Sequence, residues 1–188
     1  MRPSVRNLSC LAALVLVAAT ACHRRSSADA APVSGPRVSD GNLVAIILAA
    51  NNTDLSYARL APSRSRNADV RAFAQRMMTD HTILNARVSD LALRNRITAE
   101  EDATSLDFRD HSAERRDILR ELDGARFDST YAANEILYHT ELLAAISSVL
   151  APNARNSELR EFVSLLRPAV SAHLAHAEQL RAALSPRK

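Results

Sequence analysis

Hydrophobic residues recur every three or four positions along four long stretches of the chain, which is the spacing of one face of an amphipathic helix. The first stretch starts after Ser39 or Asp40, either of which can cap a helix, and it ends at Pro62 and Ser63. The other three stretches span about residues 68–95, 128–151 and 156–184. The pattern therefore predicts four long helices, each with one apolar face to bury.

A shorter helix is predicted between the second and third long helices, at about residues 109–123, and Gly124 is expected to end it. Residues 96–108 have no clear periodicity, although Thr98 and Glu101 have the spacing of a capping box. No segment alternates apolar and polar residues as a strand does. We therefore expect an all-α fold over residues 39–185, a four-helix bundle with a short extra helix in the central crossover.

The first 22 residues have the organisation of an export signal. Arg2 and Arg6 provide a positive start, and residues 10–19 form an apolar run. This run is too short for a membrane-spanning helix, and it is followed by small residues of the kind found at cleavage sites. We expect residues 1–22 to be a signal peptide of the lipoprotein type.

Cys22 is the predicted site of lipidation. It follows Ala-Thr-Ala, as the cysteine of a bacterial lipobox follows small residues, and its thiol would receive diacylglycerol and anchor the protein to a membrane. The same small residues also fit ordinary cleavage, which would leave a secreted or soluble periplasmic protein. Because Cys10 lies in the removed segment, the mature chain would keep one cysteine and could form no internal disulfide.

Residues 23–38 are polar, rich in Ser, Ala and Pro, and without periodicity, so they are expected to be a flexible tether. The residue after Cys22 is His23 and not the Asp that commonly retains lipoproteins at the inner membrane. We therefore expect the protein in the cell envelope, on the periplasmic side of the outer membrane.

The charge balance does not indicate a nucleic-acid partner. The formal net charge is +3, and Arg2 and Arg6 in the predicted signal peptide contribute two of these charges. The other basic residues are scattered among acidic ones, and aromatic residues make up only 4% of the chain. No platform of basic and aromatic residues can be recognised, so we expect no binding to nucleic acid.

Each of three long helices has one histidine on its apolar face, namely His81, His139 and His173, and the first helix has Asp54 on its face. A buried carboxylate is costly unless it is paired or bound to a cation, and a buried imidazole needs partners for both nitrogens. Helical bundles build metal sites from such inward residues. The four residues are therefore candidate ligands of a divalent transition metal, Zn, Fe or Mn. To share one ion, the imidazoles must lie within about 8 Å of one another, since metal–nitrogen bonds are ~2 Å.

Four further residues are candidates either to position these ligands or to act as additional ligands. Asp80 adjoins His81, Glu135 lies one turn before His139, and His176 lies one turn after His173. Tyr131 lies on the same helix face as His139. Residues that hydrogen-bond to metal ligands commonly occupy such neighbouring positions.

A structural role is the alternative for the same residues, because inward His and Asp side chains can hydrogen-bond to one another and fix helix register. The chain has no Gly-rich phosphate loop, Cys pair, nucleophile elbow or HExxH motif. A di-iron oxidase of the ferritin type would need Glu-x-x-His on two helices, and Glu135 is one residue too far from His139 for that motif. Iron oxidation is therefore disfavoured, and no catalytic residue is predicted.

Four segments of the chain resemble motifs of a bacterial envelope family known as domain of unknown function 4142. They are AANNTDLSYARLA, MMTDHTILNARVSDLALRN, GARFDSTYAANEILYH and LRPAVSAHLAHAEQL, and the likeness covers about residues 40–184. Family members usually have Glu at the position of Asp54. The resemblance implies a ferritin-like helical bundle at the outer membrane but no established reaction. The family positions that it implies are Asp80, His81, Phe127, Asp128, Tyr131, His139, Pro168 and His173.

Three functions follow from the sequence, in decreasing order of support. The first is a non-catalytic envelope protein with a binding or stress-related role. The second is a metal-binding bundle for storage or sensing, with Asp54, His81, His139 and His173 at its centre. The third is a metal-dependent oxidoreductase.

Overall fold

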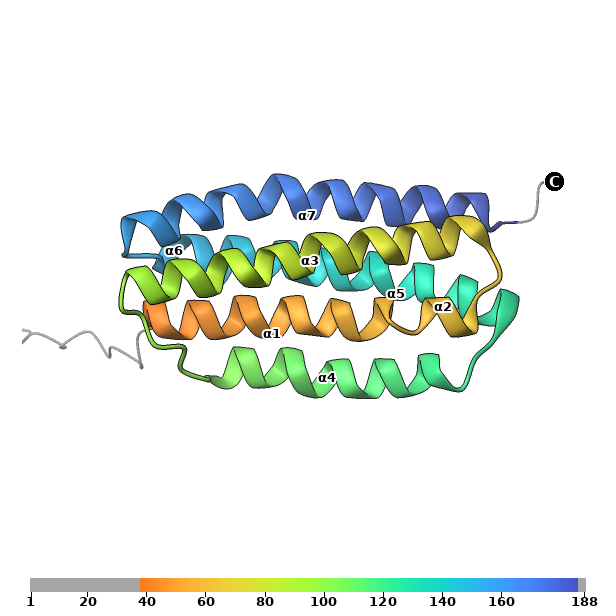
Figure 1. The fold of residues 1–188 in the computed structure, drawn as a ribbon, viewed down its shortest axis with the longest axis horizontal. Coiled ribbons are helices and arrows are strands. Elements are labelled where there is room, and N and C mark those ends of the chain that lie inside the picture. Colours follow the sequence, from red (N-terminus) through yellow and green to blue (C-terminus); the bar gives the residue numbers. More distant parts are fainter. Residues whose placement is uncertain (1–37, 186–188) are drawn as a thin grey trace, which may run out of the picture. The chain divides into compact units, whose positions relative to one another are not determined.

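The structure is a computed structural model that describes residues 38–185, and these residues form helices and connecting loops without any strand (Figure 1). The predicted signal peptide 1–22, with Cys22, and all but the last residue of the predicted tether 23–38 lie outside the described residues. No helix among the described residues is long and apolar enough to cross a membrane.

Five helices account for most of the described chain: α1 (Asp40–Ala58), α3 (Ala68–Arg94), α4 (Ala103–Arg120), α5 (Gly124–Ala145) and α7 (Ser157–Ala183). The single turn α2 (Ala61–Arg64) follows α1. Helix α5 continues into a π-helical turn (Ile146–Leu150) and the three-residue α6 (Ala151–Asn153). The all-helical prediction is confirmed over these residues.

The helices run back and forth along one common direction (Figure 1). Helix α1 pairs with α3, α5 pairs with α7, and α3 also packs against α7. Helix α4 packs against the outer side of α1 and carries the chain back along the length of the helices, so α5 runs in the same direction as α3 (Figure 1). Consequently α1, α3, α5 and α7 surround one interior, and α4 lies outside it.

Three helices begin where the sequence predicted, and each has a capping side chain at its start. Ser39 forms a capping box with Asn42 at the start of α1, and Asn67 and Asn156 accept backbone hydrogen bonds at the starts of α3 and α7. The end of the first helix differs from the prediction: α1 ends at Ala58, and Pro62 lies in the first turn of α2, where its missing N–H costs nothing.

The boundaries predicted for the middle of the chain were wrong. Helix α4 begins at Ala103, because Asp102 caps it by accepting a hydrogen bond from the backbone of Ser105, and the Thr98–Glu101 spacing forms no cap. The helix predicted as short therefore has 18 residues.

The start of the next helix was also misplaced. Gly124 begins α5 and does not merely end α4. Its φ is +56°, a left-handed conformation that glycine adopts without a steric penalty, which allows a sharp turn between the two helices. Asp128, at which the third long stretch was expected to start, is instead a buried residue within the second turn of α5.

A buried hydroxyl joins α1 to α5 near the middle of the bundle. Tyr138 is fully buried, and its hydroxyl donates to the backbone oxygen of Ala50 at 2.6 Å. Its ring packs edge-on against Tyr57, with the centroids 5.8 Å apart. Because Ala50 lies one turn before Asp54, this bond fixes the position along α5 that Asp54 faces.

Gly41 marks the closest approach between α1 and the loop that follows α3. The Gly41 backbone oxygen accepts from the backbone of Glu100 at 3.1 Å, and the Asn42 amide donates to the Glu100 backbone oxygen at 2.9 Å. A Cβ atom at Gly41 would lie only 2.5 Å from the backbone oxygen of Thr98. The loop can therefore pack here only against a residue without a side chain.

We predict that Gly41→Ala lowers the free energy of unfolding by about 1–3 kcal/mol, since the added methyl group must push the loop away. Helix propensity alone would predict the opposite sign, a gain of roughly 0.5–1 kcal/mol. Chemical denaturation measures the difference, with Ala49→Gly in the same helix reporting the propensity effect alone. A Gly41→Ala protein more stable than wild type would contradict this packing.

Candidate metal centre

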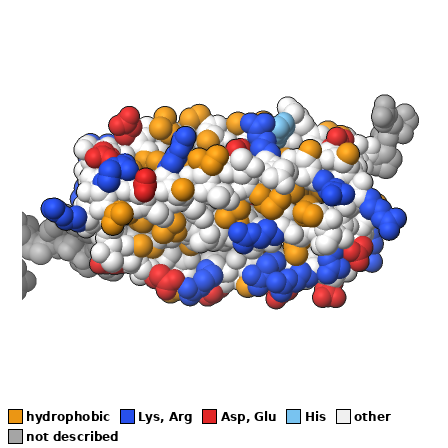
Figure 2. Space-filling view, in the orientation of Figure 1, with side chains coloured by type: hydrophobic (Ala, Val, Ile, Leu, Met, Phe, Trp, Pro, Cys, Tyr) orange, Lys and Arg blue, Asp and Glu red, His pale blue; other side chains and the backbone are white. Residues whose placement is uncertain are grey.

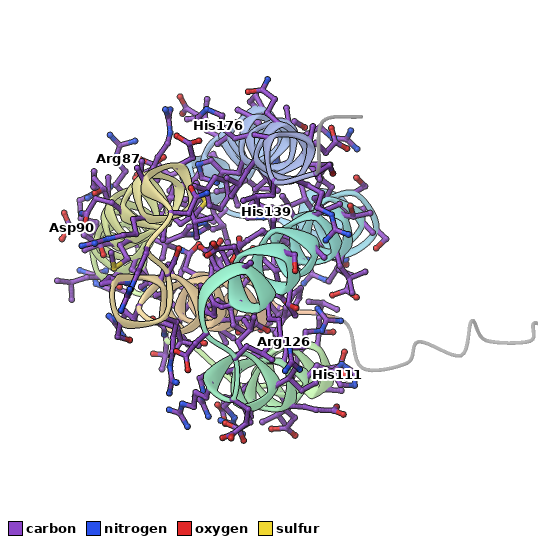
Figure 3. All side chains as sticks on the ribbon, turned by 90° about the vertical axis from the view of Figure 1, so that its right-hand side faces the viewer. Arg87, Asp90, His111, Arg126, His139 and His176 are labelled. Carbon is purple, nitrogen blue, oxygen red and sulfur yellow. The ribbon has the colours of Figure 1, made fainter. Side chains whose placement is uncertain are left out.

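Four helices each place one of the predicted metal ligands in the interior of the bundle. Asp54 comes from α1, His81 from α3, His139 from α5 and His173 from α7. The first three are fully buried, and His173 is 5% exposed. Figure 3 shows His139 in the middle of the bundle when it is viewed end-on. The structure thus brings together the four candidate ligands that the sequence indicated.

The three imidazoles are close enough to share an ion. Their ring centroids lie 5.3–6.1 Å apart, and one nitrogen from each ring lies within 4.8 Å of the other two. Ligand atoms that bind one ion at ~2 Å lie about 3–4 Å from one another. A closing movement of about 1 Å is therefore sufficient for all three to reach one ion.

The carboxylate of Asp54 lies between two of these rings. Its Oδ2 atom is 2.9 Å from His81 Nε2 and 3.3 Å from His139 Nε2. Both distances are those of ion-pair contacts, so Asp54 is the partner of whichever of these imidazoles carries a charge. The carboxylate therefore faces the inner nitrogen of both rings.

Acceptors on the far side of two rings set their orientation. His81 Nδ1 lies 2.9 Å from Asn51 Oδ1, and His139 Nδ1 lies 2.8 Å from the backbone oxygen of Glu135. Because an oxygen of this kind only accepts, each Nδ1 carries the hydrogen. In the neutral rings Nε2 then has a free lone pair on the side that faces Asp54, as metal-binding histidines require.

The ring of His173 is also held by an oxygen acceptor, but here the acceptor contacts Nε2 and not Nδ1. His173 Nε2 lies 3.0 Å from Asp80 Oδ2, which leaves Nδ1 as the nitrogen without a hydrogen-bond partner. Asp80 is also within 3.5 Å of the Arg76 guanidinium. Asp80 therefore has the positioning role proposed from its place beside His81, but it positions the histidine of another helix.

The interior contains an unusual set of buried polar atoms without hydrogen-bond partners. Such an atom costs about 1–3 kcal/mol when it stays unpaired, so native interiors keep few of them. The members of the set are His81 Nε2, His139 Nε2, His173 Nδ1 and both carboxylate oxygens of Asp54 and Glu135. A cation held by the three histidines would bind one nitrogen of each ring, since these lie within 4.8 Å of one another.

Glu135 is a further donor at the edge of this set. It is fully buried, its Oε2 lies 3.6 Å from His139 Nδ1, and it forms with Asp54 and His139 a second group of atoms within 4.8 Å of one another. Tyr131 lies one turn before it, with its buried hydroxyl also unpartnered. Glu135 is thus a candidate ligand, and Tyr131 is placed to donate to its carboxylate.

The pKa values of Asp54 and His81 show that these two residues form an ion pair when no metal is bound. Burial raises the pKa of Asp54, but the charges of His81, His139 and His173 outweigh it, and the pKa falls below its ordinary value. Burial lowers the pKa of His81, but the charge of Asp54 and its contact with the ring raise it further.

The neighbouring groups favour their neutral forms. Burial lowers the pKa of His139. Burial, together with the charges of His81 and His139, lowers the pKa of His173 to about 4. Burial and the charge of Asp54 raise the pKa of Glu135 well above its ordinary value. A metal cation would displace the protons held by His81 and Glu135.

Two residues have places that the sequence analysis did not anticipate. Asn51, which orients His81, was missed, although it lies three residues before Asp54 on the same face of α1. His176 is exposed and takes no part in the buried centre, but its ring packs edge-on against Phe73 with centroids 6.3 Å apart.

A bundle of helices with a buried histidine and carboxylate centre is the class of protein that this fold and site define. The model of one protein family, described as Domain of unknown function (DUF4142), matches residues 23–180. The chain belongs to this family, as the four sequence segments indicated. No curated protein and no solved structure matches the chain.

We predict a pH-dependent loss of stability that His173 causes in the metal-free protein. Its pKa is about 4 in the folded protein, below the ordinary value of 6.5. Between these pH values the unfolded chain binds a proton that the folded protein does not, so this contribution to stability falls as the pH is lowered from 6.5 to 4. The slope is at most about 1.4 kcal/mol per pH unit.

Denaturation with chelator present, at several pH values, measures this slope. His139 adds a loss of the same sign, whereas Glu135 opposes it above pH 4.5 because it gains its proton more readily in the folded state. Comparison with His173→Gln isolates the contribution of His173, and the variant should have the shallower slope. His111→Gln, at an exposed site on α4, should match wild type. Equal slopes for wild type and His173→Gln would refute the prediction.

Proposed function

We propose that this chain is an exported helical-bundle protein that binds one divalent transition-metal ion at the centre formed by Asp54, His81, His139 and His173. Glu135 completes the donor set. The protein holds the ion for storage or sensing and does not turn over a substrate.

The observation that carries this proposal is the convergence of three buried imidazoles and a buried carboxylate from four helices, with one nitrogen of each ring within 4.8 Å of the other two. The outer nitrogens are paired with Asn51, the Glu135 backbone and Asp80. The inner nitrogens of His81 and His139 face Asp54 Oδ2, and His173 Nδ1 has no hydrogen-bond partner. This division of partners is the usual one at metal-binding histidines.

The charges of the donor set also favour a single divalent ion. Asp54 and Glu135 contribute two negative charges when both are ionised, and three neutral imidazoles contribute none. One divalent cation makes the centre electrically neutral, whereas two cations would leave excess positive charge in a buried site, which is costly.

The ligand types limit the choice of metal. Three imidazole nitrogens with two carboxylates, and no sulfur, suit Zn, Fe or Mn. Because four of the five donor residues are fully buried, the described structure supports the holding of an ion better than turnover of a substrate.

The topology supports a ferritin-like arrangement. Helices α1, α3, α5 and α7 surround the centre, and one long connection that contains α4 joins the two halves, as the single crossover does in ferritin-like folds (Figure 1).

The export signal predicted at residues 1–22 supports a place in the cell envelope, with Cys22 as lipid anchor and the periplasmic side of the outer membrane as its destination. The face in Figure 2 has acidic, basic and hydrophobic side chains interspersed.

Elemental analysis of the purified protein after incubation with Zn, Fe or Mn tests the metal site. We expect one ion per chain with at least one of these metals, and a higher melting temperature when it binds, because an ion that binds only the folded state stabilises it. His139→Gln should lose the ion, since it removes one imidazole from the centre of the set.

His111→Gln is the matched control, because His111 is exposed on α4 and far from the centre in Figure 3. It should retain one ion per chain. If wild type binds no stoichiometric metal and its melting temperature does not respond to any of the three, the cluster is structural and the proposed function is wrong.

The lipid anchor has its own test. Cells that express the full chain and receive a radioactive fatty acid should label the wild-type protein, whereas Cys22→Ala should carry no label, because its side chain has no thiol. Equal labelling of the two proteins would exclude Cys22 as the anchor, and absence of label from both would favour simple secretion.

A further inference from the structure

The ligand set is closed to solvent except at one residue. Asp54, His81, Glu135 and His139 have no exposed surface, whereas His173 is 5% exposed. An ion that reaches the centre from solvent must pass at least one side chain. His173 is therefore the member of the set that is nearest to solvent.

A groove of about 730 Å³ between α3 and α7 reaches Asp80, the residue that His173 contacts. Phe73 and Arg76 of α3 line it, together with two groups that bind metals, the carboxylate of Asp80 and the imidazole of His176. Asp80 has a side chain that is 35% exposed, and it also contacts His173 Nε2 at 3.0 Å. Asp80 thus links the groove to the buried centre through its contact with His173.

His176 lines the same groove as Asp80. It lies one turn after His173 on α7, and its ring leans across toward α3, where it packs against Phe73 with centroids 6.3 Å apart. It is exposed, so no burial cost opposes its binding to a hydrated cation. Imidazole and carboxylate together make a weak, open site for the same metals that suit the interior.

We propose that this groove is the route of metal uptake, an inference that rests on the proposed function. Asp80 and His176 capture a hydrated divalent transition-metal ion from solvent, and His173 turns to pass the ion inward. Binding of the ion to Asp80 replaces the contacts of this carboxylate with Arg76 and with His173 Nε2, which frees the imidazole to rotate. The ion moves from two groove ligands to the larger buried set, so transfer inward is favourable.

An uptake route has a kinetic signature that a supporting role lacks. Residues on the route lower the barrier in both directions, so their loss slows association and dissociation by the same factor. A residue that only supports the bound state changes dissociation alone. The two roles are therefore distinguished by measuring both rate constants.

The test is stopped-flow binding of Co²⁺ to the purified protein, followed by the visible absorbance of the bound ion, with dissociation measured by adding a chelator. His176→Gln should lower both rate constants by the same factor, because it removes one of the two groove ligands that capture the ion. Asp80→Asn should slow association at least as much, and should also weaken equilibrium binding because it releases His173.

Asp90→Asn and His111→Gln are matched controls with the same chemical changes at exposed sites on α3 and α4 (Figure 3). Both should bind Co²⁺ at the wild-type rate. If His176→Gln and Asp80→Asn associate as fast as wild type, or if the controls slow equally, the uptake route is wrong although the buried site stands. If wild type binds no Co²⁺ or any other divalent metal, the proposed function falls as well.

Discussion

The carboxylate of Asp54 is the constraint on which the interior of this bundle depends. An ionised carboxylate without compensation costs several kcal/mol in a protein interior, and removing the partner of a buried charge is strongly destabilising. Here His81 from α3 and His139 from α5 lie 2.9 and 3.3 Å from one oxygen of Asp54. Three helices must therefore keep their relative positions along the bundle. The hydrogen bond from Tyr138 to Ala50 holds α1 and α5 in that position.

The surroundings of this carboxylate are the basis of the proposal that the centre binds a cation. Each histidine uses its outer nitrogen on an oxygen acceptor and turns the other nitrogen inward. Protons on His81 and Glu135 limit the charge while no metal is present, and a metal ion would replace them. The same chemistry links the centre outward, since the acceptor for His173 is Asp80 at the wall of the α3–α7 groove.

The stripes of hydrophobic residues were sufficient to predict the long helices and to place Asp54 and the three histidines on their inner faces. They were not sufficient for the middle of the chain, because the start of α4 depends on the local bond of Asp102 and the start of α5 on the left-handed conformation of Gly124. The part played by Asn51 was also hidden, since an Asn three residues before a buried Asp has no distinctive pattern. Which histidine Asp80 contacts depends on the packing of α3 against α7, and its neighbour in sequence, His81, was a misleading guide.

The most direct test of the central claim is a crystal structure of the protein grown with Zn²⁺ or Mn²⁺, with anomalous diffraction data at the metal edge. The claim predicts one anomalous peak inside the bundle, about 2 Å from His81 Nε2, His139 Nε2 and His173 Nδ1, with an oxygen of Asp54 as a further ligand. An interior without a peak, in which Asp54 and the imidazoles are hydrogen-bonded to one another, would contradict it.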